Sequence, residues 1–151
     1  MILPVHLEEF LKNYALLRFE LRALTQPGSG GRMKAKGYER ALEQVRSLCL
    51  ALPETHEVVA WGHPTFRAGK KMFAGFGEDR EGLTLGLKVG FDRQDELLKD
   101  ERFFPTPYAA RQGWVSLRID AKTDWDEVHG LVREAYRQVA ISRMLKALEG
   151  S

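Results

Sequence analysis

The sequence contains a single cysteine, Cys49, among its 151 residues. One cysteine cannot form a disulfide within the chain, so we expect a reducing, cytoplasmic environment and a fold held by its core. Long apolar runs are also missing, since no stretch approaches the roughly 18 residues that a membrane-spanning helix needs. Glu8 and Glu9 interrupt the first apolar segment, so we expect neither a signal peptide nor a membrane partner.

Residue patterns typical of catalysis are missing as well. Cys49 falls on the apolar stripe of a predicted helix, where a thiol is a small core residue and a poor nucleophile. Gly75-Phe76-Gly77 lacks the following helix that a dinucleotide-binding loop requires. The histidine spacings match no zinc pattern; the four are His6, His56, His63 and His129. We therefore expect no enzyme, no metal site and no cofactor.

Excess charge of one sign is small, with a net charge of +2. From Ala35 onward the sequence has 18 Lys/Arg and 18 Asp/Glu residues, so this part is neutral. Residues 1–34 carry the excess, with five basic and three acidic side chains. A neutral domain lacks the bulk positive charge of a strong nucleic-acid binder.

The N-terminal segment has leucine and aromatic residues at helical spacing as far as Leu24, which predicts an amphipathic helix. Thr25 to Gly31 has the composition of a flexible linker. We expect residues 1–32 to form this appended helix and linker, and residues 33–151 to form the domain, with Met33 as an alternative start. The helix is expected to pack on the domain or on a sister chain, and the oligomeric state stays open.

The hydrophobic pattern after residue 33 predicts an α+β domain. Strands with one apolar face between helices favour a two-layer α/β sandwich, in which helices pack on one face of an antiparallel sheet and the other face stays free. The predicted helices are Gly37–Ala51, Asp92–Lys99 and Asp124–Leu148, and the predicted strands are Glu57–Trp61, Thr65–Ala68, Lys71–Phe76, Leu83–Val89 and Trp114–Ile119. We expect a turn at residues 77–82 and an irregular stretch at 103–108.

Two strand-and-loop segments carry basic side chains and no acidic ones. The first, residues 58–77, includes Arg67, Lys70 and Lys71, and the second, residues 102–118, includes Arg111 and Arg118. Aromatic residues are interleaved with them. Lys and Arg can neutralise phosphates, and an outward-facing Trp can stack on an unpaired base. Solvated strand faces with core aromatics would give the same pattern, so both interpretations stay open.

Several separated blocks of this sequence resemble the MmcQ/YjbR family in order and spacing. The blocks are Leu52-Pro53-Glu54-Thr55-His56-Glu57, Trp61-Gly62-His63-Pro64-Thr65-Phe66-Arg67, Gly69-Lys70-Lys71-Met72-Phe73-Ala74, Phe103-Phe104 to Tyr108, Trp114-Val115-Ser116-Leu117-Arg118 and Glu134-Ala135-Tyr136-Arg137-Gln138-Val139-Ala140. The resemblance covers Lys34 to Leu148. It implies a CyaY-like (frataxin-like) sandwich and a DNA-binding role through two β-hairpin wings.

Mapped onto this sequence, one wing would fall near Arg67–Lys71 and the other near residues 77–82 or 105–113. The 77–82 turn departs from that role because Glu78, Asp79 and Glu81 would repel phosphates at a wing tip.

These observations leave two hypotheses of different classes. The first is a non-enzymatic protein that binds DNA weakly and largely without sequence preference, through Arg67, Lys70, Lys71, Lys88, Arg111 and Arg118, with Trp114 stacking on a base. The second is a protein-interaction or small-ligand module, with a pocket formed by Trp61, His63, Phe73 and Tyr108 beside Trp114.

Overall fold

The computed structural model describes residues 35–150. The predicted N-terminal helix, its linker and the alternative start at Met33 lie outside the described residues.

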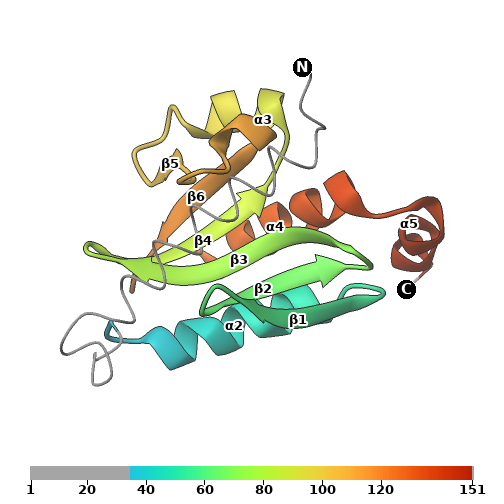
Figure 1. Ribbon diagram of the computed structural model, residues 1–151, viewed down its shortest axis with the longest axis horizontal. Helices are drawn as coiled ribbons and strands as arrows, with labels where there is room; N and C mark the ends of the chain where they lie inside the picture. The colour runs from blue at the N-terminus through green and yellow to red at the C-terminus, as the bar shows by residue number, and fades with distance from the viewer. Residues whose placement is uncertain (1–34, 151) are drawn as a thin grey trace, which may run out of the picture. The chain divides into compact units, whose positions relative to one another are not determined.

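In this part of the chain, four α-helices, one 3-10 helix and six strands follow one another (Figure 1). They are α2 (Tyr38–Leu50), β1 (Thr55–Ala60), β2 (His63–Ala68), β3 (Lys71–Asp79), β4 (Gly82–Lys88), α3 (Phe91–Leu97), β5 (Phe103–Pro105), η2 (Ala110–Gln112), β6 (Trp114–Ile119), α4 (Trp125–Val139) and α5 (Ser142–Glu149). None of these described helices is long and apolar enough to cross a membrane.

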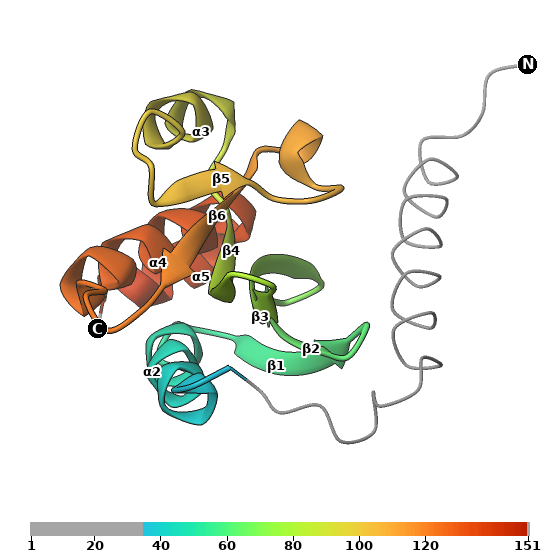
Figure 2. The same ribbon diagram turned by 90° about the vertical axis from the view of Figure 1, so that its left-hand side faces the viewer.

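All six strands join one antiparallel sheet in the order β1-β2-β3-β4-β6-β5. Helices α2 and α4 lie on the same side of this sheet (Figure 2). The expected α+β fold with two layers is therefore confirmed. We call the side of the sheet that faces away from α2 and α4 the open face.

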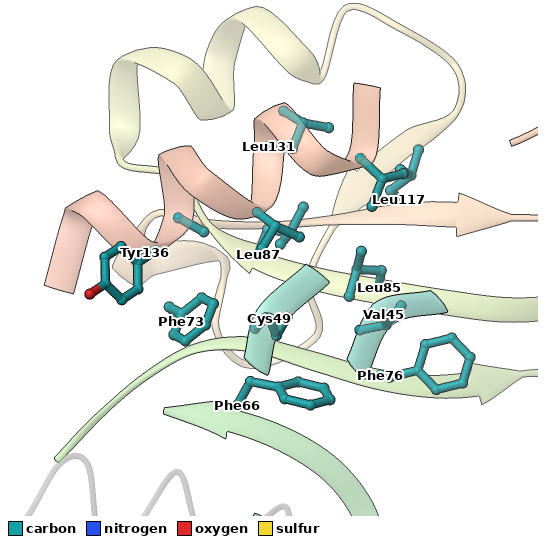
Figure 3. Close-up of a cluster of buried hydrophobic side chains, with 14 of the residues drawn as sticks. Val45, Cys49, Phe66, Phe73, Phe76, Leu85, Leu87, Leu117, Leu131 and Tyr136 are labelled. Carbon is teal, nitrogen blue, oxygen red and sulfur yellow. The ribbon is translucent and has the colours of Figure 1, made fainter. Parts of the chain in front are cut away.

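The core lies between the sheet and these two helices (Figure 3). Leu83, Leu85 and Leu87 of β4 are buried on the helix side, as the alternating pattern of that strand predicts. Tyr136 of α4 is fully buried; its ring meets Phe73 edge-on, and its hydroxyl donates a hydrogen bond to the Pro53 carbonyl over 2.8 Å. This contact ties α4 to the segment that joins α2 to β1.

Two loop predictions were wrong in detail. The expected turn at 77–82 is shorter, because β3 continues to Asp79 and β4 already begins at Gly82. Phe103–Pro105, expected to be irregular, forms edge strand β5, which pairs with β6 from Phe103↔Leu117 to Pro105↔Val115. A three-residue strand is too short to show an alternating pattern in the sequence.

The predicted helix Asp124–Leu148 is in fact two helices. Asp124 caps α4, as expected, because its carboxylate accepts hydrogen bonds from the Asp126 and Glu127 amides. Ala140 and Ile141 then take extended backbone angles and separate α4 from α5. The break lets α5 bury Met144 near the β2–β3 turn, where its methyl group lies 3.1 Å from the position a Gly69 side chain would take.

Candidate functional site

The centre of the open face is a cross-strand row with little side-chain bulk. Register places Thr65 opposite Gly75, Gly75 opposite Gly86, and Gly86 opposite Ser116. The Ser116 hydroxyl lies 2.9 Å from the Thr106 hydroxyl, which ties the loop after β5 to this row. The floor of the face is therefore formed by backbone and small polar side chains.

One end of the open face is basic. Register places His56 opposite Arg67 and Arg67 opposite Met72, and it pairs Lys88 with Trp114 at the same end of the sheet. We call these five residues the basic end. None of them is acidic, so Arg67 and Lys88 share one end of the face without an opposing charge in the set.

Two further predicted residues belong near this end. A nitrogen of the Arg67 guanidinium (Nη1) donates to the Lys70 carbonyl over 3.4 Å, which places Lys70 beside it. The amides of Val89 and Gly90, which follow Lys88, donate to the Gly113 carbonyl over 3.0 and 3.1 Å. Arg111 is two residues before that carbonyl, at the exposed position of η2.

The cations near the basic end are not neutralised by the described part of the chain. Within residues 35–150, no carboxylate forms an ion pair with any of these four; they are Arg67, Lys70, Lys88 and Arg111. The Arg67 Nε is buried and has no hydrogen-bond partner among the residues that the structure describes. Phosphate oxygens are acceptors that such a guanidinium can use.

Arg118, by contrast, lies at the far end of the open face and is already paired. Its Nη1 and Nη2 donate to the two carboxylate oxygens of Asp79 over 2.6 and 3.0 Å, and Nη2 also reaches Glu81 over 3.3 Å. The guanidinium lies 4.8 Å from the centre of the Phe104 ring. Hydrogen bonding to Arg118 holds the pKa of the Asp79 carboxyl below its usual range. The structure does not bring Arg118 together with the predicted phosphate-binding residues.

A groove of about 920 Å³ lies beside Arg118. Arg102, which lines it, donates to Asp100 and Glu127 over 2.7 Å each. The hydrogen bonds from Arg102 lower the pKa of Asp100 to about 2. Acidic side chains outnumber basic ones along the groove; the acidic residues are Asp79, Glu81, Glu101, Asp120, Asp124 and Glu127, and the basic residues are Arg80, Arg102, Arg118 and Lys122. This end of the molecule is unsuited to phosphate.

Two other predicted contact residues have limited access to the open face. Lys71 pairs with buried Ala68 and so follows the helix side of the sheet, although its own side chain is exposed. Trp114 faces the open side but is only 7% exposed, and its ring lies 3.7 Å from the position a Gly86 side chain would take. The Trp114 ring therefore packs beside Gly86, and its face is not free to stack on a base.

The four residues of the predicted pocket do not meet. Phe73 is fully buried in the core, on the other side of the sheet from His63. His63 lies on the open face beside Gly77, and Trp61 is in the β1–β2 turn with a positive φ of 53°. Tyr108 is 51% exposed in the loop after β5. These four side chains cannot line one pocket.

Gln94, which is not among the residues predicted from the sequence, positions one side of the open face. Its buried side-chain amide (Nε2) donates to the carbonyls of Ala110 and Trp114, each over 2.7 Å. These bonds hold η2 and the start of β6 together. A glutamine on the buried side of a predicted acidic helix is the only signal that could have found it.

The described residues contain no group of three or more His, Cys, Asp or Glu side chains that could hold a metal ion. Cys49 is fully buried, and burial raises the pKa of its thiol. It is the small core residue that its helix position predicts.

This fold and its open face define a two-layer α+β protein with a single antiparallel sheet. A family model described as YjbR matches residues 50–138, more than half of the chain, and the protein belongs to the YjbR family. Among solved structures, it is similar to the Deinococcus radiodurans protein DR2400, which has a DUF419 domain. The TM-score is 0.59 at 23% identity, over 72% of this chain and 87% of that chain. No curated protein sequence matches.

Proposed function

We propose that this YjbR-family protein is a non-enzymatic nucleic-acid-binding protein that contacts the sugar–phosphate backbone with the basic end of its open face. The observation that carries this proposal is the position of Arg67 and Lys88 at one end of the sheet, with no acidic residue among the five residues of the basic end. Lys70 and Arg111 extend the same positive region.

Phosphate contacts carry no sequence information, so the binding is largely independent of sequence. About four cations release counterions from about four phosphates, and the logarithm of the affinity for duplex DNA then falls with the logarithm of salt concentration with a slope of about −3.6. Between about 50 and 200 mM salt, this slope lowers the affinity roughly 100-fold. The neutral charge of residues 35–151 keeps the binding weak.

Fluorescence-anisotropy titration at these two salt concentrations tests the proposal. The double variant Arg67→Ala/Lys88→Ala should bind DNA more weakly and should reduce the salt slope by about two, one for each lost phosphate contact. The matched control is Arg40→Ala/Lys146→Ala, which removes one Arg and one Lys from exposed positions on α2 and α5. The control should bind like the wild type.

Salt-independent binding, or equal losses in the two double variants, would exclude the basic end as the site. Absence of wild-type binding at about 50 mM salt, where phosphate contacts are strongest, would exclude the function. The alternative is a protein-interaction or small-ligand module, and its small-ligand form, a pocket around Trp61, His63, Phe73 and Tyr108, is not favoured by the geometry because Phe73 lies in the core.

A further inference from the structure

The two edges of the sheet differ in how they are protected. Strands β1 and β5 are the outer strands, and within the described part of the chain each pairs on one side only (Figure 1). The outer side of an edge strand carries backbone N–H and C=O groups that can pair with a strand of another chain. Natural sheets therefore keep such strands short, place Pro, Lys or a bulge in them, or cover them.

The β5 edge offers no N–H group for such pairing. The Arg118 amide donates to the Arg102 carbonyl over 3.0 Å. Backbone groups alternate in direction along a strand, so those of Phe103 and Pro105 point outward. The Phe103 amide already donates to the Asp100 carbonyl over 3.0 Å, and Pro105 has no N–H. Strand β5 is therefore closed to strand addition.

The β1 edge, by contrast, directs N–H and C=O groups outward along its length. The turn Trp61–Gly62 has a positive φ at both residues, so Ala60 and His63 form the hydrogen-bonded pair that closes the hairpin. Every second residue before Ala60 likewise faces β2, in agreement with the Val58 carbonyl, which accepts from the Thr65 hydroxyl. The residues that alternate with these point outward; they are Thr55, Glu57 and Val59.

Strand β1 also lacks the features that protect β5. It is six residues long, contains no Pro or Lys, and pairs with β2 without a bulge. Its one carboxylate, that of Glu57, is held by Arg46 of α2, whose Nε and Nη2 donate to its two oxygens over 2.6 and 3.0 Å. This carboxylate is neutralised and directed toward α2, so it does not guard the edge.

We infer that β1 pairs with β1 of a second copy of this chain, antiparallel and across a two-fold axis, so that the two sheets join into one. The pairing that uses all the outward groups places the axis at Glu57 and sets Thr55 of one copy opposite Val59 of the other. Opposed residues of this kind exchange two hydrogen bonds, because each N–H meets the C=O of its partner.

The side chains beside this edge are self-complementary. Val59 is 67% exposed and lies toward one end of the outward row. Leu50 is 43% exposed, lies about one helical turn beyond Arg46 on α2, and precedes Thr55 by five residues, so it lies at the other end. A two-fold axis at Glu57 brings the Val59 of each copy toward the Leu50 end of the other. Each Glu57 reaches the axis already paired with its own Arg46, so two bare carboxylates do not meet.

The symmetry has a consequence for the open face. A two-fold axis that relates two antiparallel edge strands is perpendicular to the joined sheet, so both open faces lie on the same side of the dimer. The basic ends of the two copies then belong to one surface. The inference itself does not depend on the proposed function, because it rests on the edge of β1 and not on the cations.

Sedimentation of the full chain, from micromolar to near-millimolar concentration, tests the inference. The variant is Val59→Pro, which removes an outward N–H and leaves the bonds to β2 in place, because Pro is tolerated at such positions of an edge strand. The matched control is Ile141→Pro, which replaces another exposed β-branched residue. Ile141 and the preceding Ala140 already have the extended backbone that Pro and its predecessor adopt. Circular dichroism and thermal melting check that each variant is folded.

We expect the wild type and Ile141→Pro to form a dimer whose fraction rises with concentration. Val59→Pro should raise the dissociation constant of the dimer roughly tenfold or more, because each dimer loses two hydrogen bonds. Hydrogen exchange resolved by residue gives a second measurement. The amides of Thr55, Glu57 and Val59 should exchange more slowly as the dimer forms.

A wild type that stays monomeric throughout would overturn the inference and would leave the edge to a strand of a different protein. A dimer that Val59→Pro does not weaken, equal weakening by both proline variants, or a dimer in which the three amides exchange as in the monomer would overturn it as well. If Val59→Pro does not fold, Val59→Lys decides, because it keeps the backbone of β1 and adds the charge that protects natural sheet edges.

Discussion

The sequence predicts that Arg118 contacts phosphates, whereas in the structure its charge is already paired. It lies in a segment without acidic residues, yet its guanidinium forms a two-point ion pair with Asp79, 39 residues earlier in the chain. Glu81 and the Phe104 ring complete its surroundings. The pair ties the tip of the β3–β4 hairpin to β6, and it leaves the predicted phosphate-binding set without this cation.

The Asp79–Arg118 pair makes stability depend on pH with a defined sign. The pKa of Asp79 is lowered from 3.8 by the hydrogen bonds from Arg118. A group whose pKa is lower in the folded state stabilises the fold at pH values above its unfolded-state pKa. This stabilisation is lost as the pH falls through its folded-state pKa. Because Asp79 is 43% exposed, solvent screening limits this contribution to about 1 kcal/mol or less.

We therefore expect Asp79→Asn to lower the free energy of unfolding at pH 7 by up to about 1 kcal/mol. The difference from the wild type should shrink as the pH falls below 3.8. Urea titrations at several pH values measure it. A difference that is constant from pH 7 into the acid range would show that the charge of Asp79 contributes nothing.

At the scale of elements, α4 contains a glycine that its helix does not need. Gly130 lies in the middle of α4 and is exposed, and apart from the backbone of α4 itself no atom of the described residues lies within 4 Å of the position of an added Cβ. Alanine is the better helix former, by about 1 kcal/mol in a helix interior. We expect Gly130→Ala to raise the free energy of unfolding by about this amount, as measured in urea.

Gly113, at the end of η2, is the opposing case. Its φ is +83°, and a Cβ would lie 3.1 Å from the Gly90 Cα. Gly113→Ala should therefore destabilise the protein by about 1 kcal/mol or more, through a backbone conformation that side chains disfavour. Stabilisation by this second substitution would show that the loop moves freely away from β4.

At the scale of the whole molecule, residues 35–150 share one core. The buried cluster draws side chains from α2, the sheet, α4 and α5 without interruption. Domains of this size with one core usually unfold in a single cooperative step.

The three tryptophans of the chain test this cooperativity at separate places. Trp61 lies in the β1–β2 turn, Trp114 begins β6 and Trp125 begins α4. We expect variants that retain one tryptophan each, the others being replaced by phenylalanine, to show a fluorescence transition that coincides with loss of helical circular dichroism in the same variant. Separate midpoints in one variant would show that the β1–β2 hairpin or the β6 edge opens independently of the core.

Local patterns in the sequence were enough to locate most of the fold. Alternation placed Leu83, Leu85 and Leu87 on the helix side, and helical spacing placed Cys49 in the core. The strand Trp114–Ile119 was predicted with its observed bounds. These features depend on the spacing of apolar side chains a few residues apart, and such spacing can be read from the sequence within a single helix or strand.

Contacts between segments far apart in the sequence determine which side chains are available at the candidate site. Between the pairs Phe66↔Ala74 and Arg67↔Met72, β3 has one extra residue, Phe73, and this bulge directs its ring into the core. The pairing of Arg118 with Asp79 likewise depends on two strands whose residues are far apart in the chain. Alternation and charge counts describe one strand at a time, whereas a bulge and an ion pair exist only once neighbouring strands have set their register.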